Sequence, residues 1–234
     1  HFFELLEKRH LNWREITDTQ RNQLVEESVA KAMEEYQTTV FDSSARNKSM
    51  AGRIRRMTDR TLWALGCQWE HGAYEKTWHE LDFGRAGGNG VTLPVEEGLE
   101  LSLRGRIDRV DIMEDAEKNR VYVKVIDYKT GNTSFDLLAL YHGLQLQLMI
   151  YLDGALQVEQ KKYPDKEIVP AGVFYYNVKD PMIQEKIHAD VESVSDQMLK
   201  KLKMNGLVQA DDDVSFRIDN TLSSIPVSVN KDGN

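Results

Sequence analysis

The sequence predicts an α/β fold, in which a mixed β-sheet carries helices on its faces and a helical annex precedes it. Three observations predict this fold. The first third of the chain has apolar residues at helical spacing, the middle alternates apolar and polar residues, and a helix, a strand and a helix follow. The resulting core order of α-β-β-β-α-β is typical of a mixed sheet covered by helices. We divide the 234 residues into an annex at 1–76, a core at 77–205 and a C-terminal extension at 206–234.

The annex is expected to contain three helices. Residues 2–9 form a short apolar run, and residues 20–38 have apolar side chains at helical spacing behind Asp18, which we expect to cap the helix. Residues 47–76 continue the helical pattern, and neither a proline nor a glycine cluster interrupts them. These segments predict a helical annex.

The middle of the chain reads as strands. Residues 78–84 are expected to form a strand, and GRAGGNG at 84–90 a loop. The alternation over 92–113, with a turn at Glu97-Gly98, predicts strand structure up to the polar turn at 114–119. Residues 120–129 are dense in valine, tyrosine and isoleucine, so they predict the second strand of a β-hairpin.

The remaining segments complete the sheet and its cover. A long helix is predicted at 137–162, with Leu144 and Leu148 on its apolar face. A strand at 169–178 and an amphipathic helix at 188–204 are predicted next. The stretch IPVSV at 225–229 is expected to pair as an edge strand.

The composition bounds the class of protein. Hydrophobic residues make up 41% and charged residues 29%, which is ordinary globular usage and excludes disordered and collagenous chains. The single cysteine, Cys67, excludes an intramolecular disulfide. No apolar run is long enough for a membrane span and no export leader opens the chain, so we expect a cytoplasmic protein without membrane contact. The net charge of −8 does not by itself indicate nucleic-acid binding.

The predicted hairpin carries the most informative charges. Asp108 lies in the first strand, and Asp127 and Lys129 share one face of the second strand because side chains alternate. Asp108 joins that face if the residue numbers of opposed pairs sum to an odd number, whereas an even sum would place it behind the sheet. Carboxylates and an ammonium among valine and isoleucine are costly unless something satisfies them.

A divalent cation would satisfy these groups. Mg²⁺ prefers oxygen ligands, which Asp108, Asp127 and the backbone carbonyl of Tyr128 would supply. Such a metal activates water and stabilises charge on a phosphodiester, and Lys129 could orient the water or neutralise that charge. The pattern therefore suggests phosphodiester hydrolysis, and the alternative is a salt-bridged, solvated strand face.

The following helix adds two polar side chains. Gln147 and Tyr151 are four residues apart, so they lie on one helical face, where they could contact a phosphate or brace Lys129. The alternative is a satisfied amide and a core tyrosine.

Together, GRIDRVD, VIDYKTG and GLQLQLMIYL resemble the PD-(D/E)xK nucleases of the RecB type, whose pattern is GxxDR, D-x-K and Q-x-x-x-Y. HELDFG, AGVFYYNVKDPMI and the closing stretch are similar to the C-terminal region of the AddB/RexB subunit of bacterial helicase–nucleases. The resemblance implies a restriction-endonuclease-like sheet and an exonuclease that requires Mg²⁺, with Mn²⁺ as an alternative. It also implies 5′-to-3′ action on single-stranded DNA with an AddA/RexA-type subunit, in double-strand break repair and recombination.

The resemblance also assigns roles to residues. It makes Asp108 and Asp127 metal ligands, Lys129 the catalytic lysine, and Gln147 and Tyr151 the helix motif. The resemblance further implies a histidine near the metal, four residues before a glutamate. His1 is a doubtful match, because Glu4 follows it by three residues, and the matching histidine could lie upstream of the given sequence. Glu80 matches a recurrent acid without an evident role.

Two departures and two alternatives complete the expectations. Many AddB proteins hold an iron–sulfur cluster on four cysteines, but this chain has one, so no cluster is expected, as in the RexB branch. The chain begins at His1, and we expect it to be part of a longer protein. The alternative from another functional class is a non-catalytic scaffold that guides DNA or holds a helicase. A free-standing exonuclease is a third possibility, and it would use the same Asp108, Asp127 and Lys129.

Overall fold

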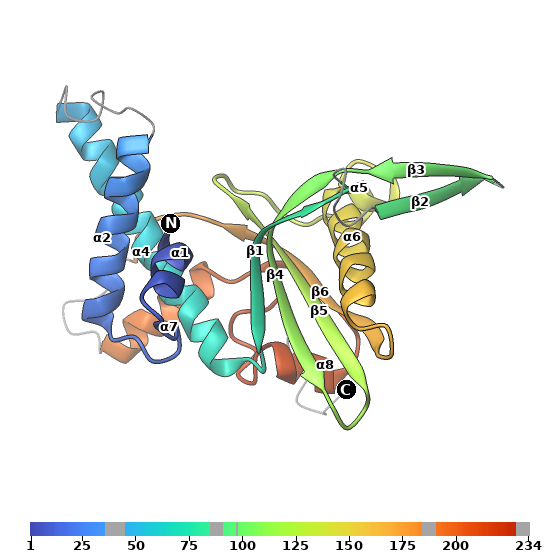
Figure 1. Cartoon of the computed structure of the whole chain (residues 1–234). Coiled ribbons are helices and arrows are strands. Elements are labelled where there is room, and N and C mark those ends of the chain that lie inside the picture. The colour runs from blue at the N-terminus through green and yellow to red at the C-terminus, as the bar shows by residue number, and fades with distance from the viewer. Residues whose placement is uncertain (36–44, 85–90, 97, 184–190, 228–234) are drawn as a thin grey trace. The chain divides into compact units, whose positions relative to one another are not determined.

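The protein is described by a computed structural model that covers residues 1–35, 45–84, 91–96, 98–183 and 191–227. The chain divides into two compact units (Figure 1). The first unit comprises residues 1–70 and 178–202, and the second comprises residues 71–177 and 203–234. The chain therefore passes from the first unit to the second, returns, and leaves again.

The first unit is helical. Its helices are α1 (Phe2–Lys8), α2 (Asp18–Glu35), α4 (Ala45–His71) and α7 (Val191–Lys201). Apolar side chains of α1, α2 and α4 form a core of Phe2, Leu6, Leu24, Val25, Val29 and Leu62. The predicted helix at 20–38 corresponds to α2, although 36–38 lie outside the described residues.

The start of α2 differs from the prediction in its cap. Asp18 is the first helical residue, and Thr17 precedes it. The Thr17 hydroxyl oxygen accepts a hydrogen bond from the Gln20 amide at 3.3 Å, and the Gln20 side chain accepts one from the Thr17 amide at 2.8 Å. These reciprocal bonds form a capping box, so Thr17 caps the helix in place of Asp18.

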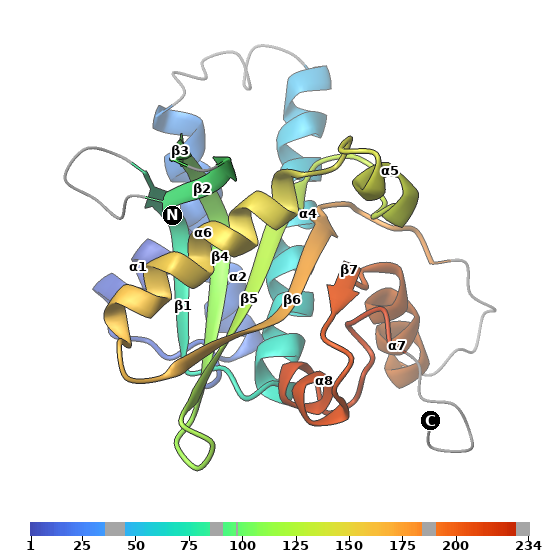
Figure 2. The same ribbon diagram turned by 90° about the vertical axis from the view of Figure 1, so that its right-hand side faces the viewer.

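The second unit contains a five-stranded mixed sheet in the order β1-β4-β5-β6-β7. The strands are β1 (Lys76–Phe83), β4 (Gly105–Asp115), β5 (Arg120–Lys129), β6 (Glu167–Asn177) and β7 (Asn205–Val208). Only β5 and β6 are parallel, because α6 (Gln147–Lys162) connects them as a crossover helix. Figure 2 shows α6 lying across one face of the sheet. A short helix, α8 (Asp212–Ile218), also belongs to this unit.

The predicted alternating run at 92–113 contains more than one strand. β2 (Val91–Glu96) and β3 (Leu99–Leu103) form a separate two-stranded ribbon, and β4 follows. Gly98 lies in the turn between β2 and β3 with φ of +81°, which glycine adopts without steric cost. The Gln157 side chain of α6 bonds the Thr92 carbonyl at 3.0 Å, so the base of the ribbon is fixed to the helix.

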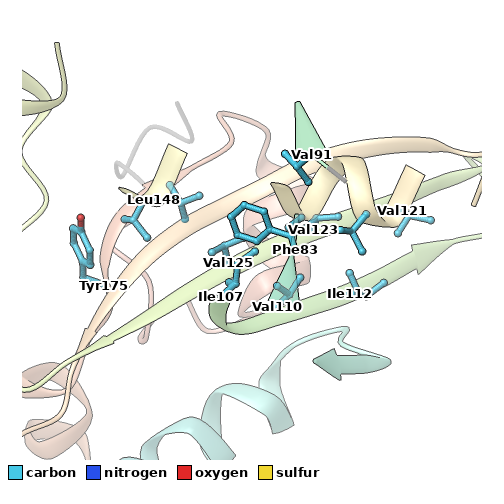
Figure 3. Close-up of a cluster of buried hydrophobic side chains, with 13 residues drawn as sticks. Phe83, Val91, Ile107, Val110, Ile112, Val121, Val123, Val125, Leu148 and Tyr175 are labelled. Carbon is cyan, nitrogen blue, oxygen red and sulfur yellow. The ribbon is translucent and has the colours of Figure 1, made fainter. Parts of the chain in front are cut away.

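The main apolar core lies between the sheet and α6 (Figure 3). Phe83 and Val91 enter it from the β1–β2 region, and Leu148, Ala155 and Val158 enter it from α6. The buried residues of the central strands are Ile107, Val110, Ile112, Val121, Val123, Val125, Val173 and Tyr175. This core holds β4 and β5 together next to the charged residues at their ends.

The prediction of one continuous helix at 137–162 is wrong, because the structure has two helices there, α5 (Leu137–Tyr141) and α6. α5 ends at its C-cap His142, and Gly143 follows with φ of +74°. The Leu144 amide donates to the Ala139 carbonyl at 2.8 Å and the Gly143 amide to the Leu140 carbonyl at 2.9 Å, which is a Schellman motif. Leu144, predicted on the buried face, is therefore outside α6 and 78% exposed.

The end of the chain also differs from the prediction. Residues 225–227 of the predicted IPVSV strand are not in a strand, and 228–229 lie outside the described residues. The edge position belongs to β7, which pairs antiparallel with β6. Of the helix predicted at 188–204, α7 covers Val191–Lys201. Among the described residues, no helix has the length and apolar character needed to cross a bilayer.

Candidate functional site

The register of β4 against β5 decides where Asp108 lies. The pairs run from Arg109↔Ile126 to Asp115↔Arg120, and every pair has an odd sum. The sequence condition is met, so alternation places Asp108 on the same face as Asp127 and Lys129. Asp108 also acts electrostatically on both Asp127 and Lys129.

The two strands stop pairing next to these residues. Arg109↔Ile126 is the last β4–β5 pair, while β5 continues beside β6 to Lys129↔Asn177. Beyond the last pair, the Asp108 side chain replaces the missing backbone partner, because its Oδ2 accepts a hydrogen bond from the Tyr128 amide at 2.8 Å. One carboxylate oxygen of Asp108 is thereby held.

Asp127 and Lys129 form a direct ion pair. Lys129 Nζ lies 2.6 Å from Asp127 Oδ2, and Asp127 is 3% exposed. Burial raises the pKa of Asp127 and the Asp108 charge adds to this rise, although Lys129 opposes it. The raised pKa indicates that the ionised carboxylate lacks full compensation, which an added cation would supply.

Lys129 remains an ammonium in this arrangement. Burial alone would lower its pKa, but the Asp127 carboxylate outweighs burial and raises the pKa of Lys129. The ammonium donates to Gln147 Oε1 at 2.9 Å, and Gln147 Nε2 donates to the Tyr151 hydroxyl at 2.9 Å. The predicted helix pair thus braces Lys129, and the five expected residues lie in one connected cluster.

Tyr151 is the outermost member of this chain of contacts, so its hydroxyl should have a modest effect. If the cluster cleaves DNA, as the motifs in the sequence imply, a Tyr151→Phe change should lower the turnover by less than tenfold, because one neutral hydrogen bond contributes only about 1 kcal/mol. The ring would keep its edge contact with Phe83, at 6.2 Å between centroids. Steady-state kinetics on single-stranded DNA measures the effect. A complete loss of cleavage would contradict this supporting position.

The donor set fits a magnesium ion. Asp108, Asp127 and the Tyr128 carbonyl offer oxygen ligands, and Mg²⁺ commonly combines one or two carboxylates with waters and substrate oxygens. Within the described ranges, no three His, Cys, Asp or Glu side chains gather into a possible metal site. The remaining ligands of such a metal would therefore come from the backbone, water and DNA.

The sequence also singled out His1 and Glu80. His1 belongs to the first unit, where its ring nitrogens lie 3.1 Å from Glu4 and 3.0 Å from Glu35. Glu80 has φ of +53° and an exposed side chain 3.2 Å from Arg106. Because these contacts do not test a metal role, the role expected for His1 stays a prediction, and Glu80 has no assigned role.

Sequence reasoning missed Tyr175. It lies in β6 directly beside Asp127 in the parallel register, and Lys129 Nζ lies 5.4 Å from the centre of its ring. The aromatic ring therefore forms one wall of the Lys129 environment. Pairing of the predicted strand at 169–178 with 120–129 in parallel would have been the signal, but that register is not visible in the sequence alone.

Comparison with known proteins identifies the family of the chain. Residues 2–222 match the PD-(D/E)XK nuclease superfamily, so the chain belongs to that family. The B subunit of the ATP-dependent helicase/deoxyribonuclease of Lachnoclostridium phytofermentans is 40% identical over 99% of this chain and 20% of its own length. The proteins of the same name from Alkaliphilus oremlandii and Clostridium novyi are 34% and 35% identical, again over 99% of this chain and 20% and 21% of their own lengths.

These relatives confirm the family resemblance seen in the sequence motifs, including the likeness to the B subunit of helicase–nucleases. The chain spans about a fifth of the length of the curated relatives named above. The mixed sheet flanked by helices is the fold expected for the superfamily.

Proposed function

We propose that this chain is a Mg²⁺-dependent DNA exonuclease domain that hydrolyses phosphodiester bonds of single-stranded DNA, with Mn²⁺ as an alternative metal. The observation that carries the proposal is the connected cluster of Asp108, Asp127 and Lys129 at the divergence of β4 and β5. A surface that only binds DNA has no need of a buried carboxylate whose ionisation is disfavoured by burial, as the ionisation of Asp127 is.

Each residue has a role in the proposed reaction. Asp108 and Asp127 would hold the metal, together with the Tyr128 carbonyl. A metal held there would supply a water of lowered pKa and would stabilise charge on the phosphate. The Lys129 ammonium orients the attacking water and neutralises negative charge on the phosphate oxygens. Gln147 keeps that ammonium in place, with Tyr151 behind it.

The names of the relatives support a proposal about the wider setting. We propose that the domain belongs to a helicase–nuclease complex with an AddA/RexA-type helicase–nuclease subunit, and that it acts in double-strand break repair and recombination in the cytoplasm. The relatives are named as B subunits of an ATP-dependent helicase/deoxyribonuclease, which supports this setting. We further propose degradation in the 5′-to-3′ direction. Because the net charge is −8, partner subunits would guide the DNA to the site.

The test is cleavage of single-stranded DNA labelled at either end. The 234-residue chain is incubated with each substrate and Mg²⁺, with Mn²⁺, or with a chelator, and the products are sized over time. We expect products only with metal, and early release of the label from the 5′ end alone. A 3′-first pattern would overturn the polarity while leaving the nuclease proposal standing.

Two further outcomes would count against catalysis by this site. Cleavage that persists equally in an Asp127→Ala variant would come from a contaminating enzyme and would remove the catalytic assignment. If the isolated chain is inactive, the same comparison is made after assembly with its helicase subunit. Inactivity there, together with unchanged DNA binding, would favour the scaffold.

A further inference from the structure

A second cluster of charged side chains lies on the face of the sheet opposite the proposed metal ligands. Arg109, Asp111 and Lys124 are 1%, 0% and 0% exposed, although each carries a charged group. Arg109 and Asp111 flank Val110 in β4, so alternation directs them away from the face that carries Asp108. Nothing in the sequence pattern indicates that these charges are buried.

Asp111 is the centre of this cluster. Its neighbours in the sheet are Thr77 of β1 and Lys124 of β5, directly opposite on either side. Asp111 Oδ1 accepts hydrogen bonds from Arg109 Nε at 2.7 Å and from the Thr77 hydroxyl at 2.8 Å. Asp111 Oδ2 lies 2.7 Å from Lys124 Nζ. Both carboxylate oxygens are therefore engaged, and the Arg109 guanidinium is fixed at its Nε.

The same guanidinium also acts on Tyr128. Tyr128 lies two residues beyond Ile126, the β5 partner of Arg109, so the two side chains are diagonal neighbours on one face of the sheet. They also interact electrostatically. The Tyr128 amide in turn holds the Asp108 carboxylate at 2.8 Å. Arg109 is therefore the sequence neighbour of Asp108, and it also interacts across the two strands with Tyr128, whose amide holds the Asp108 carboxylate.

This link lies where the backbone connection ends. Arg109↔Ile126 is the last β4–β5 pair, so no further ladder pair sets the spacing between Asp108 and the end of β5. An interaction between Arg109 and Tyr128 continues the connection by one step on the far face. Fixed outer partners of this kind orient metal ligands in many sites.

We propose that Arg109 is a positioning residue, which acts through Tyr128 and the β4 backbone to set the Asp108 carboxylate and the Tyr128 carbonyl for a divalent metal. This inference rests on the proposed metal-dependent function. Stability alone is a poor explanation for the cluster, because a buried ion pair is often no more stable than apolar residues of similar volume. The planar guanidinium can engage Asp111 and Tyr128 together, which a lysine ammonium would do poorly.

The test measures Mn²⁺ binding by the 234-residue chain, from the electron paramagnetic resonance signal of the free ion. We expect Arg109→Lys to weaken Mn²⁺ binding about tenfold, the lower end of the effect of outer-shell changes. Tyr128→Phe, which keeps the ring and the backbone, should weaken binding in the same direction by a smaller factor. In cleavage assays, both variants should lower kcat and leave KM for DNA unchanged.

Lys124→Met is the matched control. It removes a buried charge from the same cluster but leaves Arg109 bonded to Asp111 and beside Tyr128. Its Mn²⁺ affinity should equal that of the parent chain, even if its unfolding temperature changes. Equal weakening in this control would show a general loss of stability and overturn the inference.

The remaining outcomes are also decisive. Parent-like Mn²⁺ affinity in both Arg109→Lys and Tyr128→Phe would overturn the positioning role. If Arg109→Lys does not fold, Tyr128→Phe decides alone, with unchanged affinity counting against the inference. The proposed metal centre itself is tested by comparing Mn²⁺ binding in the parent chain and in an Asp127→Ala variant. If the two bind Mn²⁺ equally, or if the parent binds none, the metal centre fails, which is a result distinct from failure of the positioning role.

Discussion

An Asp127→Asn variant is expected to lose Mg²⁺-dependent cleavage of single-stranded DNA by about a thousandfold or more, since a catalytic metal contributes several kcal/mol. Asparagine keeps the size of the side chain but removes the charge that would hold the metal. The measurement is the single-turnover rate with end-labelled DNA. A rate within tenfold of the parent would contradict the assignment of Asp127 as a metal ligand.

The stability of the same variant gives an independent check. Burial raises the pKa of Asp127, so the folded metal-free protein binds the Asp127 proton more tightly than the unfolded chain does. At neutral pH the ionised form therefore lowers stability, and this loss disappears as the pH falls through the raised pKa. We expect Asp127→Asn to unfold at an equal or higher temperature than the metal-free parent at neutral pH. Added Mg²⁺ should raise the unfolding temperature of the parent only.

A Lys129→Met variant is expected to bind single-stranded DNA nearly as well as the parent but to cleave it about 10²- to 10⁴-fold more slowly, the range for a positioned group that assists proton transfer or charge stabilisation. Methionine keeps the unbranched stem of lysine and removes the ammonium that contacts Asp127 and Gln147. Fluorescence anisotropy measures the binding, and single-turnover kinetics measures the cleavage.

A matched control separates the charge of Lys129 from its surroundings. Gln147→Leu removes the hydrogen bond to Lys129 but leaves the ammonium on Asp127. It should slow cleavage by less than Lys129→Met does. Lost DNA binding with unchanged turnover in Lys129→Met would contradict the role proposed for Lys129, because the residue would then serve substrate capture.

The strands that carry the site were predictable because their pattern is local. Residues 120–129 are dense in β-branched and aromatic side chains, and β5 has those bounds. The odd register was a condition that the sequence could state but could not decide, because the turn at 114–119 allows more than one pairing. The structure decides it through pairs such as Arg109↔Ile126.

Other features could not be read locally. The helical pattern continues through 142–146, yet Gly143 adopts a left-handed conformation and ends α5 in a Schellman motif. β7 is a strand because it pairs with the edge of β6, although its residues Asn205–Val208 alternate too little to predict one. The burial of Arg109 and Asp111 depends on what covers the far face of the sheet, which no local pattern reveals.

The division of the chain has a practical consequence for anyone who wishes to shorten it. Because residues 178–202 group with residues 1–70, the helical unit is built from two separate stretches of sequence. Deleting the N-terminal stretch alone would leave α7 without the rest of its unit, and would remove Arg56 and Arg60 of α4, which pair with the Asp180 carboxylate. A minimal catalytic fragment would have to excise both stretches and rejoin Asn177 to Lys203 with a new linker.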